Sequence, residues 1–113
     1  MNGFIKTTYK KSMEEEVLMP QKFKERAKEL KEKMKDVSGC DAGANTRERP
    51  YVVARAMIAH VLIEEGCTFQ QTGQLLGRNH STIVHYEKNM AAYLSSPGYE
   101  AERELWEKFK KEI

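Results

Sequence analysis

Residues 68–85 read TFQQTGQLLGRNHSTIVH, and this stretch predicts two helices joined by a short turn. The T-x-x-Q pattern at its start is a capping box, which predicts a helix over residues 69–76. Gly77 ends this helix, and a second helix begins at about His80. So short a connection is typical of a helix-turn-helix, although short helical hairpins also occur in proteins with many other functions.

Apolar residues recur at helical spacing on both sides of this stretch, and no segment shows the alternation of a strand. A narrow apolar seam begins near Pro20 and predicts a helix over residues 20–37. Pro50 opens another helix, which Gly66 ends, and a C-terminal helix follows Gly98. The side chains expected to face the core are Phe23, Ala27, Leu30, Met34 and Val37, then Val53, Met57, Ile58, Val61 and Leu62, then Ile83, Val84, Met90 and Leu94, and finally Tyr99, Trp106, Phe109 and Ile113.

The sequence therefore predicts an all-α protein, a helix-turn-helix bundle with extra N- and C-terminal helices. The stretch SGCDAGAN at 38–45 is a glycine-containing linker and the best internal boundary. The wide aromatic face of the C-terminal helix needs a cover, which the core or the N-terminal helix would supply. The expected parts are a disordered tail at 1–12, the N-terminal helix and linker at 13–44, the helix-turn-helix unit at 45–95, and the C-terminal helix at 96–113.

The composition is that of a soluble domain without a strong charge bias. Of the 113 residues 32% are charged, yet the net charge is only +2, so any DNA-binding surface must come from local segregation of basic residues. The N-terminal residues MNGFIKTTYKK lack the apolar core of a signal peptide, and no apolar run approaches membrane-spanning length. We therefore expect a cytoplasmic protein that does not bind a membrane.

Residues that bind metals or catalyse reactions do not form a recognisable pattern. The three histidines, together with Cys40 and Cys67, match no zinc spacing, and two free thiols in a reducing compartment are expected. Ser81 and His85 lie four residues apart on one helix, but no third partner or oxyanion loop accompanies them. We therefore expect no metal, no cofactor and no enzyme activity.

The start of the helix near His80 carries an unusual concentration of hydrogen-bonding side chains. A helix N-terminus offers unpaired N–H groups and a partial positive charge to phosphate, and in a helix-turn-helix it meets base edges in the major groove. Arg78 can bind phosphate or guanine, Asn79 can form a bidentate pair with adenine, and His80 can donate to a purine. Alternatively, Asn79 or Ser81 caps the helix, and Arg78 is a solvated loop residue.

The string RPYVVARAMIAHVLIEEGCTFQQTGQLLGRNHSTIVH resembles the C-terminal DNA-binding domain of the bacterial replication initiator DnaA. The hallmark of that family is close to G-R-D-H-[ST]-T-V-x-H, and residues 77–85 read GRNHSTIVH. An A-R-Q helix precedes the hallmark in the family, and Ala54-Arg55 stands at its place here. The match covers about residues 45–94 and implies a Trp-repressor-like helix-turn-helix that binds double-stranded DNA sequence-specifically, in replication initiation or its control.

The resemblance also implies DNA contacts position by position. An ungapped count back from Arg55 places Arg47 in the minor groove, with Arg49 beside it. The residues implied at major-groove base edges are Asn79, His80 and Ser81. The residues implied at the DNA backbone are Arg49, Arg55, Thr68, Gln70, Gln71, Arg78, Thr82 and His85, with the 68–71 segment acting through main-chain N–H groups.

The chain departs from the family pattern at the surface that would read bases. The hallmark aspartate, which accepts a hydrogen bond from cytosine N4, is Asn79 here, and the preferred DNA site is therefore expected to differ. Ala56 stands where the family has a glutamine, which removes one polar contact. Thr72 replaces an apolar residue, and the turn is a glycine shorter than in many members.

Two further expectations follow from what surrounds the matched segment. No G-x-x-x-x-G-K phosphate loop occurs in the chain, so we expect no ATP binding. The alternative function is a protein-interaction adaptor or a transcriptional regulator of a phage or mobile element. The terminal helices would then bind a partner protein or a second copy of the chain, with the DnaA-like core as a scaffold.

Overall fold

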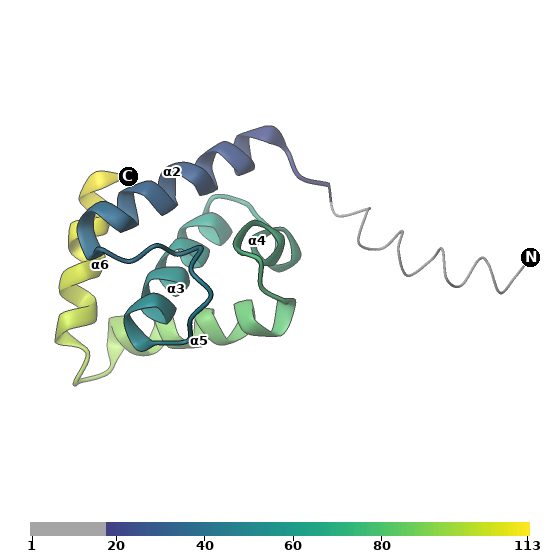
Figure 1. The fold of residues 1–113 in the computed structure, drawn as a ribbon. Helices are drawn as coiled ribbons and strands as arrows, with labels where there is room; N and C mark the ends of the chain where they lie inside the picture. Colours follow the sequence, from purple (N-terminus) through teal and green to yellow (C-terminus); the bar gives the residue numbers. More distant parts are fainter. Residues whose placement is uncertain (1–17) are drawn as a thin grey trace, which may run out of the picture.

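The computed structural model describes residues 18–113, which fold into five helices and contain no strand (Figure 1). The expected all-α fold is confirmed. The tail expected at residues 1–12 lies outside the described residues. The helices are α2 (Gln21–Ser38), α3 (Arg49–Glu64), α4 (Phe69–Leu76), α5 (His80–Ser95) and α6 (Glu100–Glu112).

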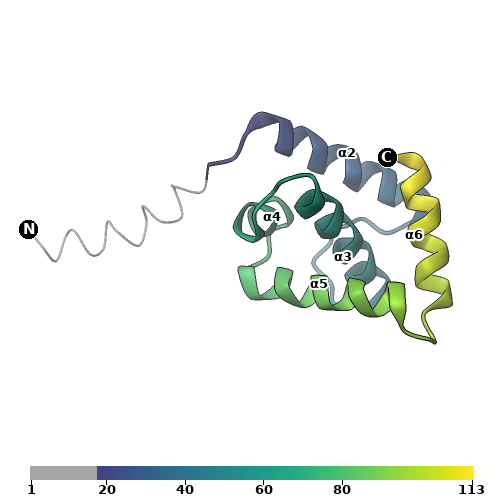
Figure 2. The ribbon, with the colours of Figure 1, turned by 180° about the vertical axis from the view of Figure 1, so that it is seen from behind.

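The helices are arranged around α3, which packs against α2, α4 and α5. Figure 1 and the reverse view in Figure 2 show α2 and α5 on opposite sides, with α3 and α4 between them. After α5 the chain turns back, and α6 packs against both α5 and α2. The C-terminal helix is therefore covered by the core and by the N-terminal helix together.

The central position of α3 follows from its composition. Seven consecutive residues, 53–59, are buried, because apolar side chains surround the helix on all sides. Arg55 is the single charged residue in this run, and only 1% of its surface is exposed. A charged side chain at such a position needs partners inside the protein.

The apolar seam predicted for the first helix is confirmed. Ala27, Leu30 and Met34 are buried, and Phe23 and Val37 are partly buried against the same core. Most of the lysines and glutamates between them are exposed and form a solvated surface, whereas Lys31 is partly buried and donates to the carbonyl of Leu75 on α4 at 3.0 Å.

The inward face of α5 differs from the prediction at its C-terminal end. Ile83 and Met90 are buried as predicted, whereas Leu94 is 40% exposed, and that prediction is wrong. Tyr86 and Tyr93 are buried instead, which gives a regular spacing of three, four and three residues along the buried face. The returning C-terminal helix explains the shift, because the ring of Tyr93 packs 5.3 Å from the ring of Tyr99, the residue before α6.

The loop between α2 and α3 belongs to the core. Cys40 and Ala42 are buried, and they share one apolar cluster with residues of α2, α3 and α6. The residues on either side of the expected boundary at 38–45 therefore pack as a single unit within the described part of the chain.

Polar contacts fix α6 in place. Arg103 donates two hydrogen bonds of 2.8 Å, to the carbonyl oxygens of Tyr93 and Ser96 at the end of α5. The ring of His60 lies edge-on to Trp106 at 5.6 Å, and its Nδ1 lies 3.0 Å from a carboxylate oxygen of Glu87. These contacts join α3, α5 and α6.

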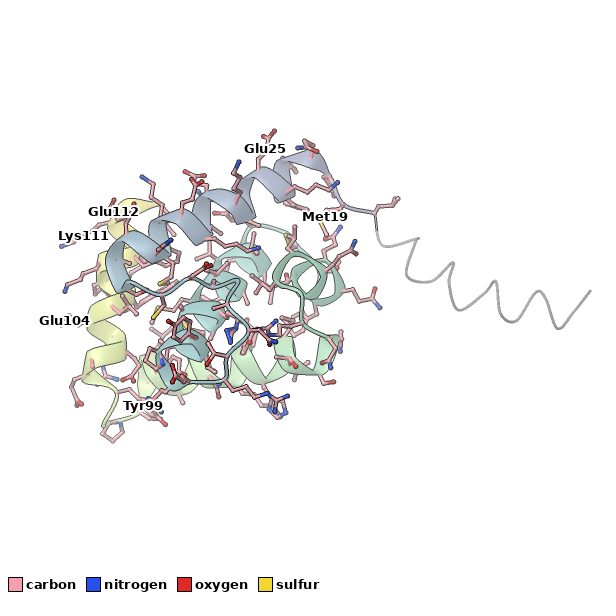
Figure 3. All side chains as sticks on the ribbon, viewed as in Figure 1. Met19, Glu25, Tyr99, Glu104, Lys111 and Glu112 are labelled. Carbon is pink, nitrogen blue, oxygen red and sulfur yellow. The ribbon has the colours of Figure 1, made fainter. Side chains whose placement is uncertain are left out.

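The outer faces of the two terminal helices are strongly charged. Figure 3 shows Glu25 on α2 and Glu104, Lys111 and Glu112 on α6 projecting away from the body of the protein. In the described part of the chain, no helix combines the length and the apolar character needed to cross a membrane.

Candidate nucleic-acid interface

The start of α4 is fixed by the capping box that the sequence predicts. The Thr68 hydroxyl accepts from the backbone N–H of Gln71 at 3.0 Å, and the Gln71 side-chain oxygen accepts from the N–H of Thr68 at 2.9 Å. The Gln71 amide nitrogen donates to the carbonyl of Leu18 at 2.8 Å. The Gln71 side chain is therefore engaged inside the protein. The capping box uses the main-chain N–H groups of Thr68 and Gln71, so of the four expected at DNA only those of Phe69 and Gln70 remain without an acceptor.

The turn between α4 and α5 depends on two glycines. Gly77 ends α4 with a φ of 67°, in the left-handed region that favours glycine. Gly73 lies within α4, and a Cβ there would come within 2.5 Å of the carbonyl oxygen of Arg78. The backbone N–H of Arg78 also donates to the carbonyl of Gly73 at 2.8 Å. The two segments thus approach too closely for any side chain at position 73.

Asn79 is the N-cap of α5. Its side-chain oxygen accepts from the backbone N–H of Thr82 at 2.9 Å and from the Thr82 hydroxyl at 3.1 Å. The alternative in which Asn79 caps the helix is therefore confirmed. A carbonyl oxygen has two lone pairs, and both are occupied, so the bidentate pair expected with adenine cannot form while this cap is intact.

Three of the expected DNA contacts lie exposed on α5. His80 and Ser81 occupy its first turn, and His85 lies one turn beyond Ser81 on the same face. The ring of His80 packs against Phe69 of α4 at a centroid distance of 5.8 Å, which orients it from the side of the turn. The first turn of the helix thus presents polar groups to the exterior from a fixed scaffold.

A cleft of about 430 Å³ opens beside this helix start. It lies between the loop before α3, α3 itself and the first turns of α5. Three arginines line it, and none of its described lining residues is acidic. The lining residues are Asn45, Thr46, Arg47, Val52, Arg55, Arg78, Thr82 and Tyr86.

Arg55 forms the buried wall of the cleft. Its Nε donates to the hydroxyl of Tyr86 at 3.3 Å, and its Nη2 donates to the carbonyl oxygen of Thr46. Its Nη1 is buried, and no hydrogen-bond partner for it exists among the described residues. Burial lowers the pKa of the guanidinium, Tyr86 opposes this effect, and the neighbouring charge of Arg78 adds to it. Arginine nevertheless stays protonated in proteins, so the cleft contains a buried cation with an unused donor.

The structure separates Arg49 from this cleft. Its Nη2 lies 2.7 Å from a carboxylate oxygen of Glu102 on α6, and its guanidinium lies 5.7 Å from the ring of Tyr99. The hydrogen bond with Glu102 raises the pKa of Arg49 and lowers the pKa of Glu102. Arg47 and Arg49 were expected side by side at the DNA, but only Arg47 lines the cleft.

Sequence reasoning missed the residues that complete the cleft, namely Asn45, Thr46, Val52 and Tyr86. Tyr86 carries a usable signal, because it follows Ile83 by three residues on the buried face and a buried tyrosine hydroxyl needs a hydrogen-bond partner.

No protein-family model, curated protein or solved structure matches this chain.

Residues 18–113 contain no group of three or more histidine, cysteine or acidic side chains placed to hold a metal ion. Cys40 and Cys67 are both buried free thiols. Burial is the main cause that raises the pKa of the Cys67 thiol above its ordinary value. Neither cysteine lines the arginine cleft.

Proposed function

We propose that this protein binds duplex DNA sequence-specifically, with α4 and α5 as a helix-turn-helix and α5 as the recognition helix. The observation that carries the proposal is the arginine cleft beside the N-terminus of α5. It combines Arg47, Arg55 and Arg78 with a buried donor that has no described partner.

The cleft suits a phosphate group on electrostatic grounds. A chain of net charge +2 gathers three arginines here, which is the local segregation that DNA binding requires in such a protein. Leaving a buried donor unpaired costs about 1–3 kcal/mol, and more when it is charged. A phosphate in the cleft would lie beside this buried cation, and a shift of the Arg55 side chain toward it would replace the unpaired donor by a charge-assisted hydrogen bond.

The first turn of α5 supports the same proposal. Its backbone N–H groups at His80 and Ser81 precede the first capped position, Thr82, and carry the partial positive charge of the helix terminus. A phosphate in the cleft would fix the register of the helix, while the exposed side chains of residues 79–81 would meet base edges.

We further propose a role in the initiation of DNA replication or its control, supported by the resemblance of residues 77–85 to the DnaA hallmark. A transcriptional regulator would use the same surface. DNA of a bacterial cell or of a phage within it lies in the cytoplasm, and we place the protein there.

The rival function, an adaptor that binds a partner protein through its terminal helices, needs a free apolar face on α2 or α6. Ala27, Leu30 and Met34 of α2, and Trp106 and Phe109 of α6, are all buried within this chain. The apolar faces that such a partner would use are therefore occupied, which favours DNA binding over the adaptor.

Selection of a preferred duplex from random sequences, followed by titration at several salt concentrations, tests the proposal. Arg78→Ala should weaken binding to the selected duplex and reduce the slope of log K against log salt by about 1, because one phosphate contact is lost. Lys28→Ala, which removes an exposed charge on the outer side of α2, is the matched control. It should change neither the affinity for the selected duplex nor the slope of log K against log salt. Absence of any enriched sequence and of binding at low salt would overturn the proposed function.

A further inference from the structure

The cap of α5 determines which hydrogen-bonding group of Asn79 remains free. A backbone N–H only donates, so the side-chain atom 2.9 Å from the N–H of Thr82 must be the carbonyl oxygen and not the amide nitrogen. The Thr82 hydroxyl, 3.1 Å from the same oxygen, fills its second lone pair. The amide nitrogen of Asn79, with two donor hydrogens, is therefore the group left over.

This amide belongs to an exposed residue next to the arginine cleft. Asn79 lies between Arg78, which lines the cleft, and His80, which begins α5. Thr82, the partner of the cap, also lines the cleft. The buried Nη1 of Arg55 in the same cleft has no described partner and points independently to an anionic ligand there. A duplex held at the cleft would bring base edges to the first turn of α5.

A donor-only side chain discriminates among bases in the major groove. Guanine presents two adjacent acceptors, N7 and O6, whereas the polar group of cytosine is the N4 donor. Adenine offers N7 beside a competing N6 donor, and thymine offers O4 beside a methyl group. An amide whose oxygen is occupied is therefore matched best by guanine and worst by cytosine.

We propose that Asn79 is a specificity-determining residue that selects guanine over cytosine at one position of the DNA site, through its amide nitrogen as a donor. This inference rests on the proposed DNA-binding function and names the base chemistry that the site reads. Asn79 accepts from cytosine only by releasing Thr82 and giving up the cap, and the cap thus enforces the choice.

Asn79→Asp reverses the hydrogen-bonding character of this position without removing the cap. Aspartate caps helices about as well as asparagine, and its second oxygen accepts where the amide donates. At one base pair of the selected site, the wild type should favour guanine over cytosine by on the order of tenfold or more in Kd. Asn79→Asp should favour cytosine at that base pair and keep the wild-type preferences elsewhere. The ratio between bases is the measurement, because the added negative charge weakens binding to every duplex.

Asn79→Ser is the matched control. Serine retains a good N-cap but has no amide, so the thermal midpoint should be kept while the discrimination at that one position disappears. The same base preference in the wild type and Asn79→Asp at every position would overturn the inference and leave the proposed function standing. The inference would also be overturned, with the proposed function left standing, if the wild type preferred cytosine at the base pair where its preference differs from that of Asn79→Asp. Absence of sequence-specific binding by the wild type would overturn the proposed function and this inference together.

Discussion

Two arginines on α3, six residues apart, lie in opposite environments. The Arg49 side chain is 61% exposed, yet it has a carboxylate partner on α6 and an aromatic ring beside it. Arg55 is 1% exposed, and one of its donors has no described partner. Water can accept hydrogen bonds from the exposed donors of Arg49, so that residue needs no protein partner. The buried donors of Arg55 do need partners within the protein, and its Nη1 has none among the described residues.

This difference separates an arginine whose contacts join two helices from a buried arginine with an unpaired donor, which we propose binds a ligand. Evolved proteins pair nearly all buried polar groups, and an exception calls for an explanation. A functional site is where the rules of local stability are commonly broken. We propose that the cleft at Arg55 is such a site, whereas the Arg49–Glu102 pair is a structural contact that joins α3 to α6.

Of the substitutions proposed here, Gly73→Ala should reduce the free energy of unfolding most, because Gly73 lies against the turn that carries Arg78 beside the arginine cleft. The added Cβ would lie 2.5 Å from the carbonyl oxygen of Arg78, so the turn that positions Arg78 must shift. We expect a loss of about 2–3 kcal/mol in the free energy of unfolding, measured by urea denaturation.

Gly98→Ala, before α6 on the Arg49 side, is the matched change. Gly98 has a φ of 91° but no atom within 4 Å of an added Cβ, so only backbone strain of about 1 kcal/mol opposes the alanine. Equal losses for the two variants would show that the close approach at Gly73 does not hold the turn.

Glu102→Gln removes the carboxylate partner of Arg49 and should have a smaller, pH-dependent effect on the stability of the protein. The hydrogen bond from Arg49 lowers the pKa of Glu102 below its ordinary value of 4.5. A carboxylate with a lowered folded-state pKa contributes stability that is present above the unfolded pKa and is lost as the pH falls through the folded pKa. The wild type should therefore lose its advantage over Glu102→Gln below about pH 4.5, as thermal midpoints between pH 7 and pH 3 would reveal.

The DNA affinity of Glu102→Gln at pH 7 provides the control, since Arg49 lies outside the arginine cleft and affinity should be unchanged. A constant difference in thermal midpoint at every pH would contradict the pairing of Glu102 with Arg49.

The helix limits were predictable because their signals are local. Thr68 with Gln71 and the glycine at 77 define α4 from a few residues of sequence, and the structure reproduces that helix as residues 69–76. The cap at Asn79 was visible as one of two alternatives, because asparagine before a helix both caps and reads bases. That the side-chain oxygen of Asn79 forms the cap, which leaves only the amide nitrogen free, became clear from the position of Thr82.

The partners of the two arginines were not predictable from the sequence. Glu102 lies 53 residues from Arg49, and Tyr86 lies 31 residues from Arg55, so no local pattern records either contact. The family resemblance implied a contact of Arg55 with the DNA backbone and gave no sign that the side chain is buried, although the flanking Ala54 and Ala56 lie in an apolar run. Long-range packing also explains why Tyr93 is buried where Leu94 was predicted to be, because Tyr93 contacts Tyr99 next to α6.

The most direct test of the account is the Kd of Arg55→Met and Arg49→Met for the selected duplex, beside the wild type. Methionine fills much of the arginine volume but leaves the Tyr86 hydroxyl and the Thr46 carbonyl without the donor that Arg55 supplies, so the thermal midpoint of Arg55→Met is measured first to establish that it is folded. We predict that Arg55→Met loses affinity by about 100-fold, as expected for a charge-assisted hydrogen bond to phosphate. Arg49→Met should stay within about threefold of the wild type. Wild-type affinity in a folded Arg55→Met would contradict the claim that the arginine cleft binds DNA.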